Sequence, residues 1–164
     1  MALDVGCGSA EIATTLGNEC RYVGVDPLPL ATPGGPPLVR GVGERLPFHA
    51  KTFDLVLILE TLDHCQSPAL LLAEVCRVLT PDGILCVEQY LSRPDWQERL
   101  RRWWEGSAGP RPAPCDGSKV VLLDESDVLG LIREAFAEVQ VGVAPGGTHL
   151  FARAGRKRQA SGER

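Results

Sequence analysis

The sequence predicts an open, doubly wound α/β sheet that is mostly parallel and finishes with a reversed strand. Short apolar runs bounded by Gly, Asp or Pro alternate with helical patterns along the first half of the chain. Such runs are typical of strands buried on both faces, and their alternation with helices indicates parallel crossover connections. The last third instead predicts two strands joined by a Gly-containing turn, which would form an antiparallel hairpin.

The first half contains four predicted strands and two predicted helices. A helix over residues 9–16 would start at the capping-type Ser9 and end before Gly17. The segment 27–37 holds five prolines and two glycines where a second crossover helix is expected, so it predicts an irregular loop. A helix over residues 67–79 would start at Ser67-Pro68 and end before the turn Pro81-Asp82-Gly83. The predicted strands cover residues 3–6, 22–25, 53–59 and 84–87.

The second half contains one predicted helix around residues 96–104 and then a segment rich in Pro and Gly, 106–117. A helix over residues 125–136 and strands over 138–143 and 149–154 follow, with the turn at 145–147. We therefore expect one domain over residues 1–155 and a disordered basic tail over 156–164.

Composition narrows the class of protein. The chain has 164 residues, 44% of them hydrophobic and 23% charged, which suits one globular domain. No apolar run approaches the roughly 18 residues of a membrane span, and the first residues do not resemble a signal peptide. The six cysteines form no C-x-x-C pair, which favours reduced thiols in the cytoplasm and predicts no metal site.

The formal net charge of -4 disfavours a nucleic acid or another anionic polymer as a general partner. Five basic residues lie within the last dozen positions, so the body of the chain is more acidic than the total. We interpret this basic end as a solvated tail rather than as a nucleic-acid-binding arm.

The junction of the first strand and helix carries a glycine loop, Asp4-Val5-Gly6-Cys7-Gly8-Ser9-Ala10-Glu11. Glycines at such a junction let a ligand approach the main chain closely. A dinucleotide loop, G-x-G-x-x-G, would place its last position at Glu11, which does not fit. A loop for S-adenosylmethionine has an acidic residue followed by x-G-x-G-x-G. Asp4, Gly6 and Gly8 match it, and only the third glycine is changed, to Ala10.

Asp26 closes the second strand at the distance where a carboxylate would hydrogen-bond both ribose hydroxyls of a nucleotide cofactor. The alternative is that Asp26, which precedes a proline, is only a turn residue.

Further motifs follow in a fixed order. The segments LDVGCG, LPF, FDLV, LDH, RVL and PDG lie between residues 3 and 90. Because these segments occur in the order and at the spacing of that family, the chain resembles the class I S-adenosylmethionine-dependent methyltransferases that act on small molecules. The resemblance implies a seven-stranded, Rossmann-like sheet with the cofactor across the carboxyl ends of the first, second and fourth strands.

Positions are carried over from this family one by one. Asp4, Gly6 and Gly8, with Cys7 between the glycines, would border the methionine part of the cofactor, and Asp26 would bind the ribose. Gly43 and Glu44 would lie beside the adenine and Glu60 near the sulfonium. His64 occupies a position where the family often has His, near the rim of the active site.

The chain departs from the family pattern in three places. Val42 stands where an acidic residue commonly reaches the adenine amino group, and Ala10 replaces a glycine. Only two residues precede the first strand, whereas relatives carry N-terminal helices that cover the cofactor. We therefore expect weak cofactor binding by this chain, and a partner chain is one way to cover the open N-terminal side.

Methyl transfer from a sulfonium is an in-line displacement that needs positioning more than a catalytic dyad. If the acceptor must lose a proton, His64 is the candidate base, although a histidine that caps the next turn is an equal alternative. Glu88 and Tyr90 are weaker candidates for contact with an acceptor. Trp96, Leu100, Trp103 and Trp104 share one helix face, which predicts packing or a lid over an apolar acceptor.

The leading hypothesis is methyl transfer from S-adenosylmethionine to a small, apolar or aromatic molecule. One alternative is a non-catalytic domain of this fold within a larger assembly. The other, a nicotinamide-dependent oxidoreductase, is disfavoured by Glu11 in the loop.

Overall fold

The computed structural model describes residues 1–17, 20–31, 33–91, 123–145 and 147–157. Seven strands form one sheet in the order β3-β2-β1-β4-β5-β7-β6. The strands are β1 (Ala2–Val5), β2 (Tyr22–Asp26), β3 (Leu38–Arg40), β4 (Phe53–Leu59), β5 (Leu79–Tyr90), β6 (Phe136–Val143) and β7 (His149–Lys157). The helical elements are α1 (Ile12–Leu16), the 3-10 turn η1 (Leu62–His64), α2 (Pro68–Val78) and α4 (Glu125–Ala135).

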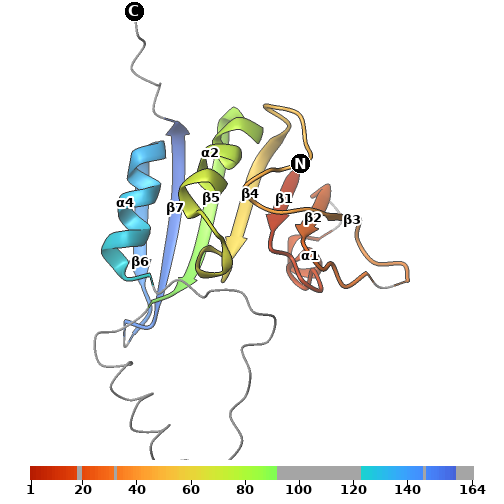
Figure 1. Ribbon diagram of the computed structural model, residues 1–164, viewed down its shortest axis with the longest axis horizontal. Helices are drawn as coiled ribbons and strands as arrows, with labels where there is room; N and C mark the ends of the chain where they lie inside the picture. Colours follow the sequence, from red (N-terminus) through yellow and green to blue (C-terminus); the bar gives the residue numbers. More distant parts are fainter. Residues whose placement is uncertain (18–19, 32, 92–122, 146, 158–164) are drawn as a thin grey trace, which may run out of the picture.

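Strand directions confirm the predicted fold class. The pairs β1–β2, β1–β4, β2–β3 and β4–β5 are parallel, whereas β7 is antiparallel to both β5 and β6. The reversed strand β7 therefore lies between its two neighbours, and its arrow points the opposite way to that of β5 (Figure 1). The sheet is mixed only at this end, as the predicted hairpin required.

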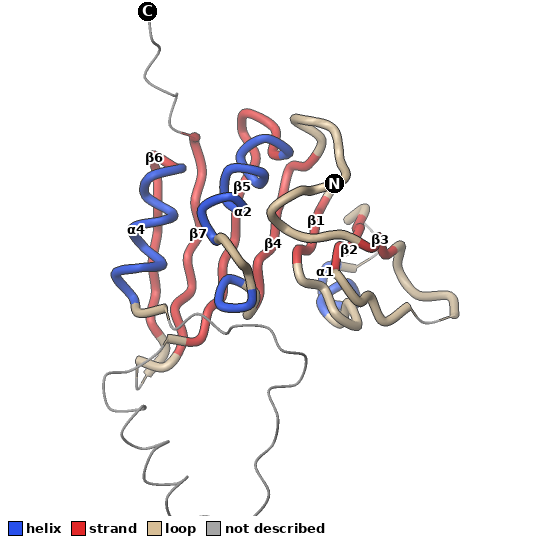
Figure 2. Tube along the Cα trace, viewed as in Figure 1, coloured by secondary structure: helices blue, strands red, loops and turns tan. Residues whose placement is uncertain are grey.

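Helices α2 and α4 lie side by side in front of the sheet in Figures 1 and 2. Ser67 caps α2, because its hydroxyl accepts a hydrogen bond from the Leu70 amide at 3.3 Å. Asp124 and Asp127 form a capping box at the start of α4. Both helices therefore begin within a residue of their predicted starts.

The core lies between these helices and the sheet. Leu3 and Val5 of β1 are buried in it, together with Val56 and Ile58 of β4. Because side chains alternate across a strand, Ala2 and Asp4 face the other side of the sheet. Both are buried as well, so β1 is a central strand covered on each side.

Several boundaries differ from the sequence prediction. Helix α1 begins at Ile12 and has no side-chain cap, so Ser9 lies outside the helix and its hydroxyl donates instead to Glu11. The prolines of residues 27–37 do form a loop, but Leu38–Arg40 then pairs with β2 as an unpredicted edge strand. Strand β5 begins at Leu79, with a register shift before Ile84 that absorbs the Pro81–Gly83 segment.

Strand β7 continues through Lys157, whose backbone is paired with that of Phe136. This is two residues beyond the domain boundary expected at 155. The remaining tail residues and the expected helix at residues 96–104 lie outside the described residues.

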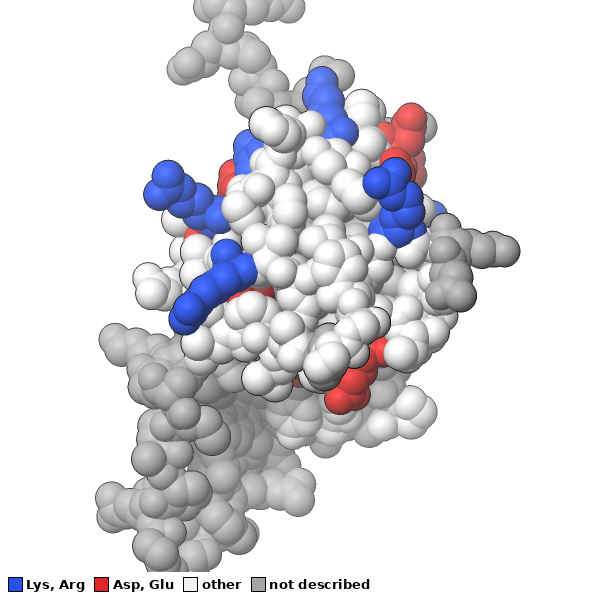
Figure 3. All heavy atoms as spheres, turned by 90° about the vertical axis from the view of Figure 1, so that its right-hand side faces the viewer, with Lys and Arg blue, Asp and Glu red and all other residues white. Residues whose placement is uncertain are grey.

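No helix in the described part of the chain is long and apolar enough to cross a membrane. On the face shown in Figure 3, Lys and Arg side chains lie apart from one another and do not form a patch.

Candidate functional site

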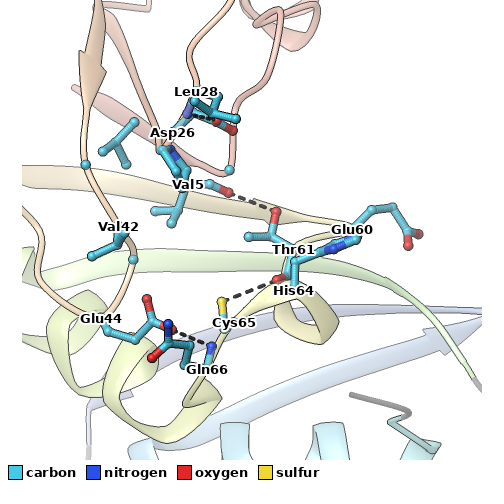
Figure 4. A pocket seen from close by; sticks show the side chains of 15 residues that line it. Val5, Asp26, Leu28, Val42, Glu44, Glu60, Thr61, His64, Cys65 and Gln66 are labelled. Carbon is cyan, nitrogen blue, oxygen red and sulfur yellow. Dashed lines mark hydrogen bonds between the residues drawn. The ribbon is translucent and has the colours of Figure 1, made fainter. Parts of the chain in front are cut away.

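A cavity of about 430 Å³ opens where β1, β2 and β4 end at their carboxyl edges. Its walls come from the ends of β1 and β2, from the loop after β3, and from the segment that joins β4 to η1 (Figure 4). In open parallel sheets, ligands bind at this edge, outside the carboxyl ends of the strands. The walls include six of the nine predicted site residues: Gly6, Asp26, Gly43, Glu44, Glu60 and His64.

Gly6 is required by the close approach of Thr61. Its backbone φ is +77°, in the left-handed region, and a methyl group at Gly6 would overlap the Thr61 side chain. The Thr61 hydroxyl lies 3.1 Å from the carbonyl oxygen of Val5 and 2.9 Å from that of Leu59. Thr61, which itself lines the cavity, therefore joins the ends of β1 and β4.

The Asp26 carboxylate connects the glycine loop to the segment after β2. Its Oδ2 accepts a hydrogen bond from the Gly8 amide at 3.0 Å, and its Oδ1 accepts one from the Leu28 amide at 2.7 Å. Each oxygen keeps a second lone pair, so both can still accept from a ligand hydroxyl. The carboxylate is thus already oriented at the cavity wall.

Ala10 explains why a glycine suits the third position of the loop. Its φ is +59°, a left-handed conformation that costs an L-residue with a Cβ roughly 1–2 kcal/mol and costs glycine nothing. The Ala10 amide donates to the Cys7 carbonyl at 2.6 Å, so the loop keeps its turn despite the substitution.

The opposite wall is the loop after β3, which carries Gly43 and Glu44. A methyl group at Gly43 would come within 2.7 Å of the Leu71 side chain, so this backbone lies directly on α2. The Glu44 carboxylate accepts hydrogen bonds from the amides of Gln66 and Ser67, at 2.8 and 3.3 Å. Glu44 thereby fixes the segment that leads from η1 into α2.

A side-chain clamp on α2 holds the same loop. Arg77 donates to both carboxylate oxygens of Glu74 at 2.7 Å, and to the carbonyl oxygens of Phe48 and Leu46 at 2.7 and 2.9 Å. Glu74 in turn accepts from the Leu46 amide at 2.8 Å. Hydrogen bonding to Arg77 lowers the pKa of Glu74 and raises that of Arg77. The clamp places the loop without taking part in the cavity wall.

Apolar side chains at the cavity mouth are unusually exposed. Leu28 is 62% exposed and Val42 is 46% exposed, and both line the cavity. Val42 is the residue at which the resemblance led us to expect a carboxylate. This edge of the cavity therefore offers apolar surface rather than a carboxylate.

Glu60 follows β4 in a left-handed conformation, with φ of +51°. Its backbone lines the cavity, but its carboxylate points away from Asp26, Val42 and Glu44 (Figure 4). There, Oε2 accepts from the Tyr90 amide at 2.9 Å and Oε1 lies 3.5 Å from Nε2 of His149. Glu60 therefore separates the cavity from a second group of side chains on β5 and β7.

His64 ends η1 at the cavity wall, with its side chain 55% exposed. Its Nε2 lies 3.9 Å from Oδ1 of Asp63, a buried oxygen with no hydrogen-bond partner. The fully buried Gln89 holds η1 in place, because its Oε1 accepts from the Leu62 amide at 3.1 Å. His64 is thus held on a fixed turn but is open to solvent.

Neither cysteine near the cavity is a thiolate nucleophile. Burial raises the pKa of Cys65 to about 12, with further contributions from Glu44 and Asp63. Burial, followed by Asp4 and Asp26, raises the pKa of Cys7 to about 11. Both thiols therefore stay protonated at neutral pH.

Asp4, Cys7 and Gly8 are not among the residues that line the cavity. Asp4 is buried, and its Oδ2 accepts a hydrogen bond from the Tyr22 hydroxyl at 2.7 Å. Burial raises the pKa of Asp4, although the bond from Tyr22 acts in the other direction. Its contact with the methionine part of a cofactor stays a prediction.

Sequence reasoning missed Thr61, Gln89 and His149. Thr61 and Gln89 act through contacts between segments far apart in the chain, which no local pattern reveals. The sequence places His149 only at the start of a strand, and its position beside Glu60 depends on how β7 pairs with β5.

Comparisons with known proteins agree with this arrangement. The family described as methyltransferase domain matches residues 3–87, more than half of the chain. Norajmaline N-methyltransferase from Rauvolfia serpentina is 28% identical over 105 residues, which cover 56% of this chain and 36% of that protein. The chain thus spans about a third of the length of this curated relative.

Solved structures share the fold at low sequence identity. One is a methyltransferase from Thermotoga maritima that is named as a possible histamine N-methyltransferase. It is 19% identical, with a TM-score of 0.69 over 95% of this chain and 82% of that chain. Another is a chain in a Haloferax volcanii complex between the methyltransferase activator Trm112 and a protein assigned as a methyltransferase. It is 15% identical, with a TM-score of 0.70 over 98% of this chain and 83% of that chain.

The sheet order, the reversed β7 and the cavity at the carboxyl ends of β1, β2 and β4 are the architecture that the sequence motifs implied. With the family match over residues 3–87, these findings lead to one conclusion. The chain belongs to the methyltransferase domain family, within the class I S-adenosylmethionine-dependent methyltransferases.

Proposed function

We propose that the cavity binds S-adenosylmethionine and that the chain transfers its methyl group to a small organic molecule. The observation that carries this proposal is that Gly6, Asp26, Gly43, Glu44 and Glu60 line one cavity. These residues are scattered along the sequence, and the motif around each predicts a cofactor contact. A volume of about 430 Å³ lies within the range of small-molecule sites.

The cavity chemistry fits the parts of the cofactor. The oriented Asp26 carboxylate suits the two ribose hydroxyls, and the exposed Leu28 and Val42 suit the apolar faces of the adenine. The turn at Gly6 and Gly8 leaves main chain open to the methionine part. Asp4, whose Oδ2 accepts a hydrogen bond from the Tyr22 hydroxyl, is predicted to border the methionine part as well.

The bound cofactor supplies an electrophilic methyl group, so the main task of the chain is to orient the acceptor and exclude water. Glu60 and Thr61, at the end of β4, mark the side of the cavity that faces an acceptor. His64 stays the predicted proton acceptor, with Asp63 beside it to stabilise the charged ring. The small acceptor is predicted to be apolar or aromatic. The two similar N-methyltransferases add nitrogen compounds to the candidates.

Binding of S-adenosylhomocysteine and NAD to the chain of residues 1–164 tests the proposal. We expect S-adenosylhomocysteine to bind in calorimetry and to raise the thermal midpoint. At a concentration of 100 times Kd, a ligand specific for the folded state adds about 2.7 kcal/mol to stability. NAD should do neither. Tighter binding of NAD would overturn the proposal in favour of an oxidoreductase.

A second candidate is a non-catalytic domain that acts within a larger assembly. One similar structure comes from a complex with a methyltransferase activator, and the described helices α2 and α4 cover only one face of β4 and β5. A partner chain that covers the cavity should tighten S-adenosylhomocysteine binding, and calorimetry with and without the partner tests this. For the domain limits, we propose that the cofactor-binding unit expected over residues 1–155 extends to the end of β7 at Lys157, followed by a basic tail.

A further inference from the structure

A groove of about 380 Å³ runs along the face of the sheet opposite α2 and α4. Its lining includes Leu59, Cys86, Glu88, Gln140, Phe151 and Arg153. Strand pairing sets these residues side by side: Glu88 lies opposite Phe151 on β7, and Cys86 lies opposite Arg153. Val87 and Leu150, which alternate with them, point into the core.

Glu88, which lines the groove, also belongs to a group of three polar side chains whose other two members lie outside the groove lining. The carboxylates of Glu60 and Glu88 and the ring of His149 place one atom each within 4.8 Å of the other two. Among the described residues, no lysine or arginine forms an ion pair with either carboxylate. Two carboxylates held this close without a fixed cation attract a positively charged ligand.

Exposed aromatic rings adjoin the same group. Tyr90 is 48% exposed, and its ring meets the His149 ring edge to face with centroids 5.2 Å apart. Phe151 is 45% exposed beside Glu88. Aromatic faces next to carboxylates suit an organic ammonium, which gains from both the rings and the negative charge.

We propose that the groove is the acceptor site and that its acceptor is a small organic amine. The ammonium would lie at Glu60 and Glu88, and the apolar body of the amine would lie over Phe151 and Leu59. This inference rests on the proposed function, because the Glu60 backbone borders the cofactor cavity while its carboxylate belongs to the three-residue group. An ammonium nitrogen about 2.8 Å from each of two oxygens holds them roughly 4.6 Å apart, which the spacing of the group accommodates.

The transfer step balances with the residues present. For an amine acceptor, His149 takes the proton in place of His64. The ammonium first gives one proton to Nε2 of His149, which is free to accept it when Nδ1 carries the ring hydrogen and donates to Thr148 Oγ1 at 3.1 Å. The Glu60 carboxylate, 3.5 Å away, stabilises the imidazolium. The nitrogen lone pair then forms the N–CH3 bond, while the S–CH3 bond breaks and its electron pair stays on sulfur.

Arg153 is the cation in the groove lining, and it lies farther from the cavity because it is opposite Cys86 rather than Glu88. It disfavours a second positive charge on the distal part of the acceptor. The three atoms of Glu60, Glu88 and His149 could also hold a divalent cation, so the experiment distinguishes an organic ammonium from a metal ion.

The experiment uses three phenyl compounds as probes: phenethylamine, the alcohol of matched size, 2-phenylethanol, and the anionic 3-phenylpropionate. Each is titrated by ligand-observed NMR into the full chain saturated with S-adenosylhomocysteine, in buffer with EDTA. We expect phenethylamine to bind about tenfold or more tightly than the alcohol, because a charge-assisted hydrogen bond is lost in the alcohol. Glu88→Gln should remove this preference, whereas Glu134→Gln, an exposed carboxylate on α4, should not.

The experiment separates failure of the proposed function from failure of the acceptor assignment. If S-adenosylhomocysteine does not bind, the proposed function fails. If it binds but the alcohol or the propionate equals or exceeds the amine, only the acceptor assignment is overturned. A separate titration without EDTA tests for a metal. If Mn²⁺ or Zn²⁺ binds at micromolar concentration, Glu88→Gln abolishes this binding and no amine binds, the group is a metal site and the acceptor assignment is overturned. If Glu88→Gln fails to fold, Glu60→Gln, checked by circular dichroism, replaces it with the same expected loss of preference, because it removes the other carboxylate of the group.

Discussion

Asp26 has two roles at one wall of the cavity. It holds the amides of Gly8 and Leu28, and in the proposed function it also binds the ribose hydroxyls. The two roles can be separated, because an asparagine keeps one carbonyl oxygen as an acceptor but loses the charge. Alanine removes both.

Asp26→Ala should therefore weaken S-adenosylhomocysteine binding by about tenfold or more, since charge-assisted hydrogen bonds contribute roughly 1.5–3 kcal/mol each. Asp26→Asn should lie between alanine and the wild type. Calorimetry of folded variants measures both. An unchanged affinity in Asp26→Ala would show that Asp26 is only a turn residue.

Asp4 should make the fold less stable at neutral pH than an uncharged residue would. Its pKa is raised in the folded state, so its contribution to stability is fully present below the unfolded value of about 3.8 and is lost as pH rises through the folded value. Asp4→Asn keeps an acceptor for Tyr22 without a buried charge. It should stabilise the chain at pH 7 by about 0.5–2 kcal/mol, and the gain should shrink near pH 3.5. Urea unfolding at both pH values measures this, and destabilisation at pH 7 would contradict it.

At the scale of elements, the site depends on loops that are fixed to α2 and β5. Gln89 holds η1 from inside the sheet, and Arg77 and Glu74 hold the loop after β3 from α2. None of these residues lines the cavity. Changes in them should nevertheless alter ligand binding, because they place Glu44 and His64.

Arg77→Met should lower the free energy of unfolding by about 1–3 kcal/mol, because the carbonyl oxygens of Leu46 and Phe48 lose a donor. The Arg77 and Glu74 side chains are partly exposed, which favours the lower end of this range. S-adenosylhomocysteine binding should weaken with it. Arg45→Met, a change in an exposed arginine of the same loop, is the matched control and should have little effect.

The same clamp predicts a pH dependence. The pKa of Glu74 is lowered in the folded state, so its contribution is present above the unfolded value of about 4.5 and is lost as pH falls through the folded value. Wild-type stability should therefore drop below pH 4.5 more steeply than that of Arg77→Met. Equal slopes in urea unfolding between pH 5 and 3 would show that the clamp does not contribute.

At the scale of the whole molecule, the charge distribution predicts no binding to nucleic acid. The net charge is -4, and the face in Figure 3 carries no cluster of Lys and Arg. We expect no saturable binding of a fluorescent 20-base-pair DNA at about 150 mM salt, measured by anisotropy. Micromolar binding that weakens with added salt, and that is lost when residues 158–164 beyond β7 are removed, would assign the tail as a nucleic-acid arm.

Much of this architecture is determined by local sequence. Apolar runs and the helix caps Ser67 and Asp124 place most of the elements, because periodicity and capping act over a few residues. The proline-rich loop and the antiparallel hairpin also follow from local turn chemistry. Spacing alone predicts Asp26 at the end of a buried strand, and the structure puts it at the cavity wall.

Only the tertiary structure decided which distant residues meet. The three residues of β3 have no strong local pattern and become a strand by pairing with β2. Thr61 lies against Gly6 only because β4 pairs with β1, and His149 meets Glu60 only because β7 lies antiparallel to β5. The register between strands far apart in the chain is set by the packing of the whole sheet, which no short stretch of sequence contains.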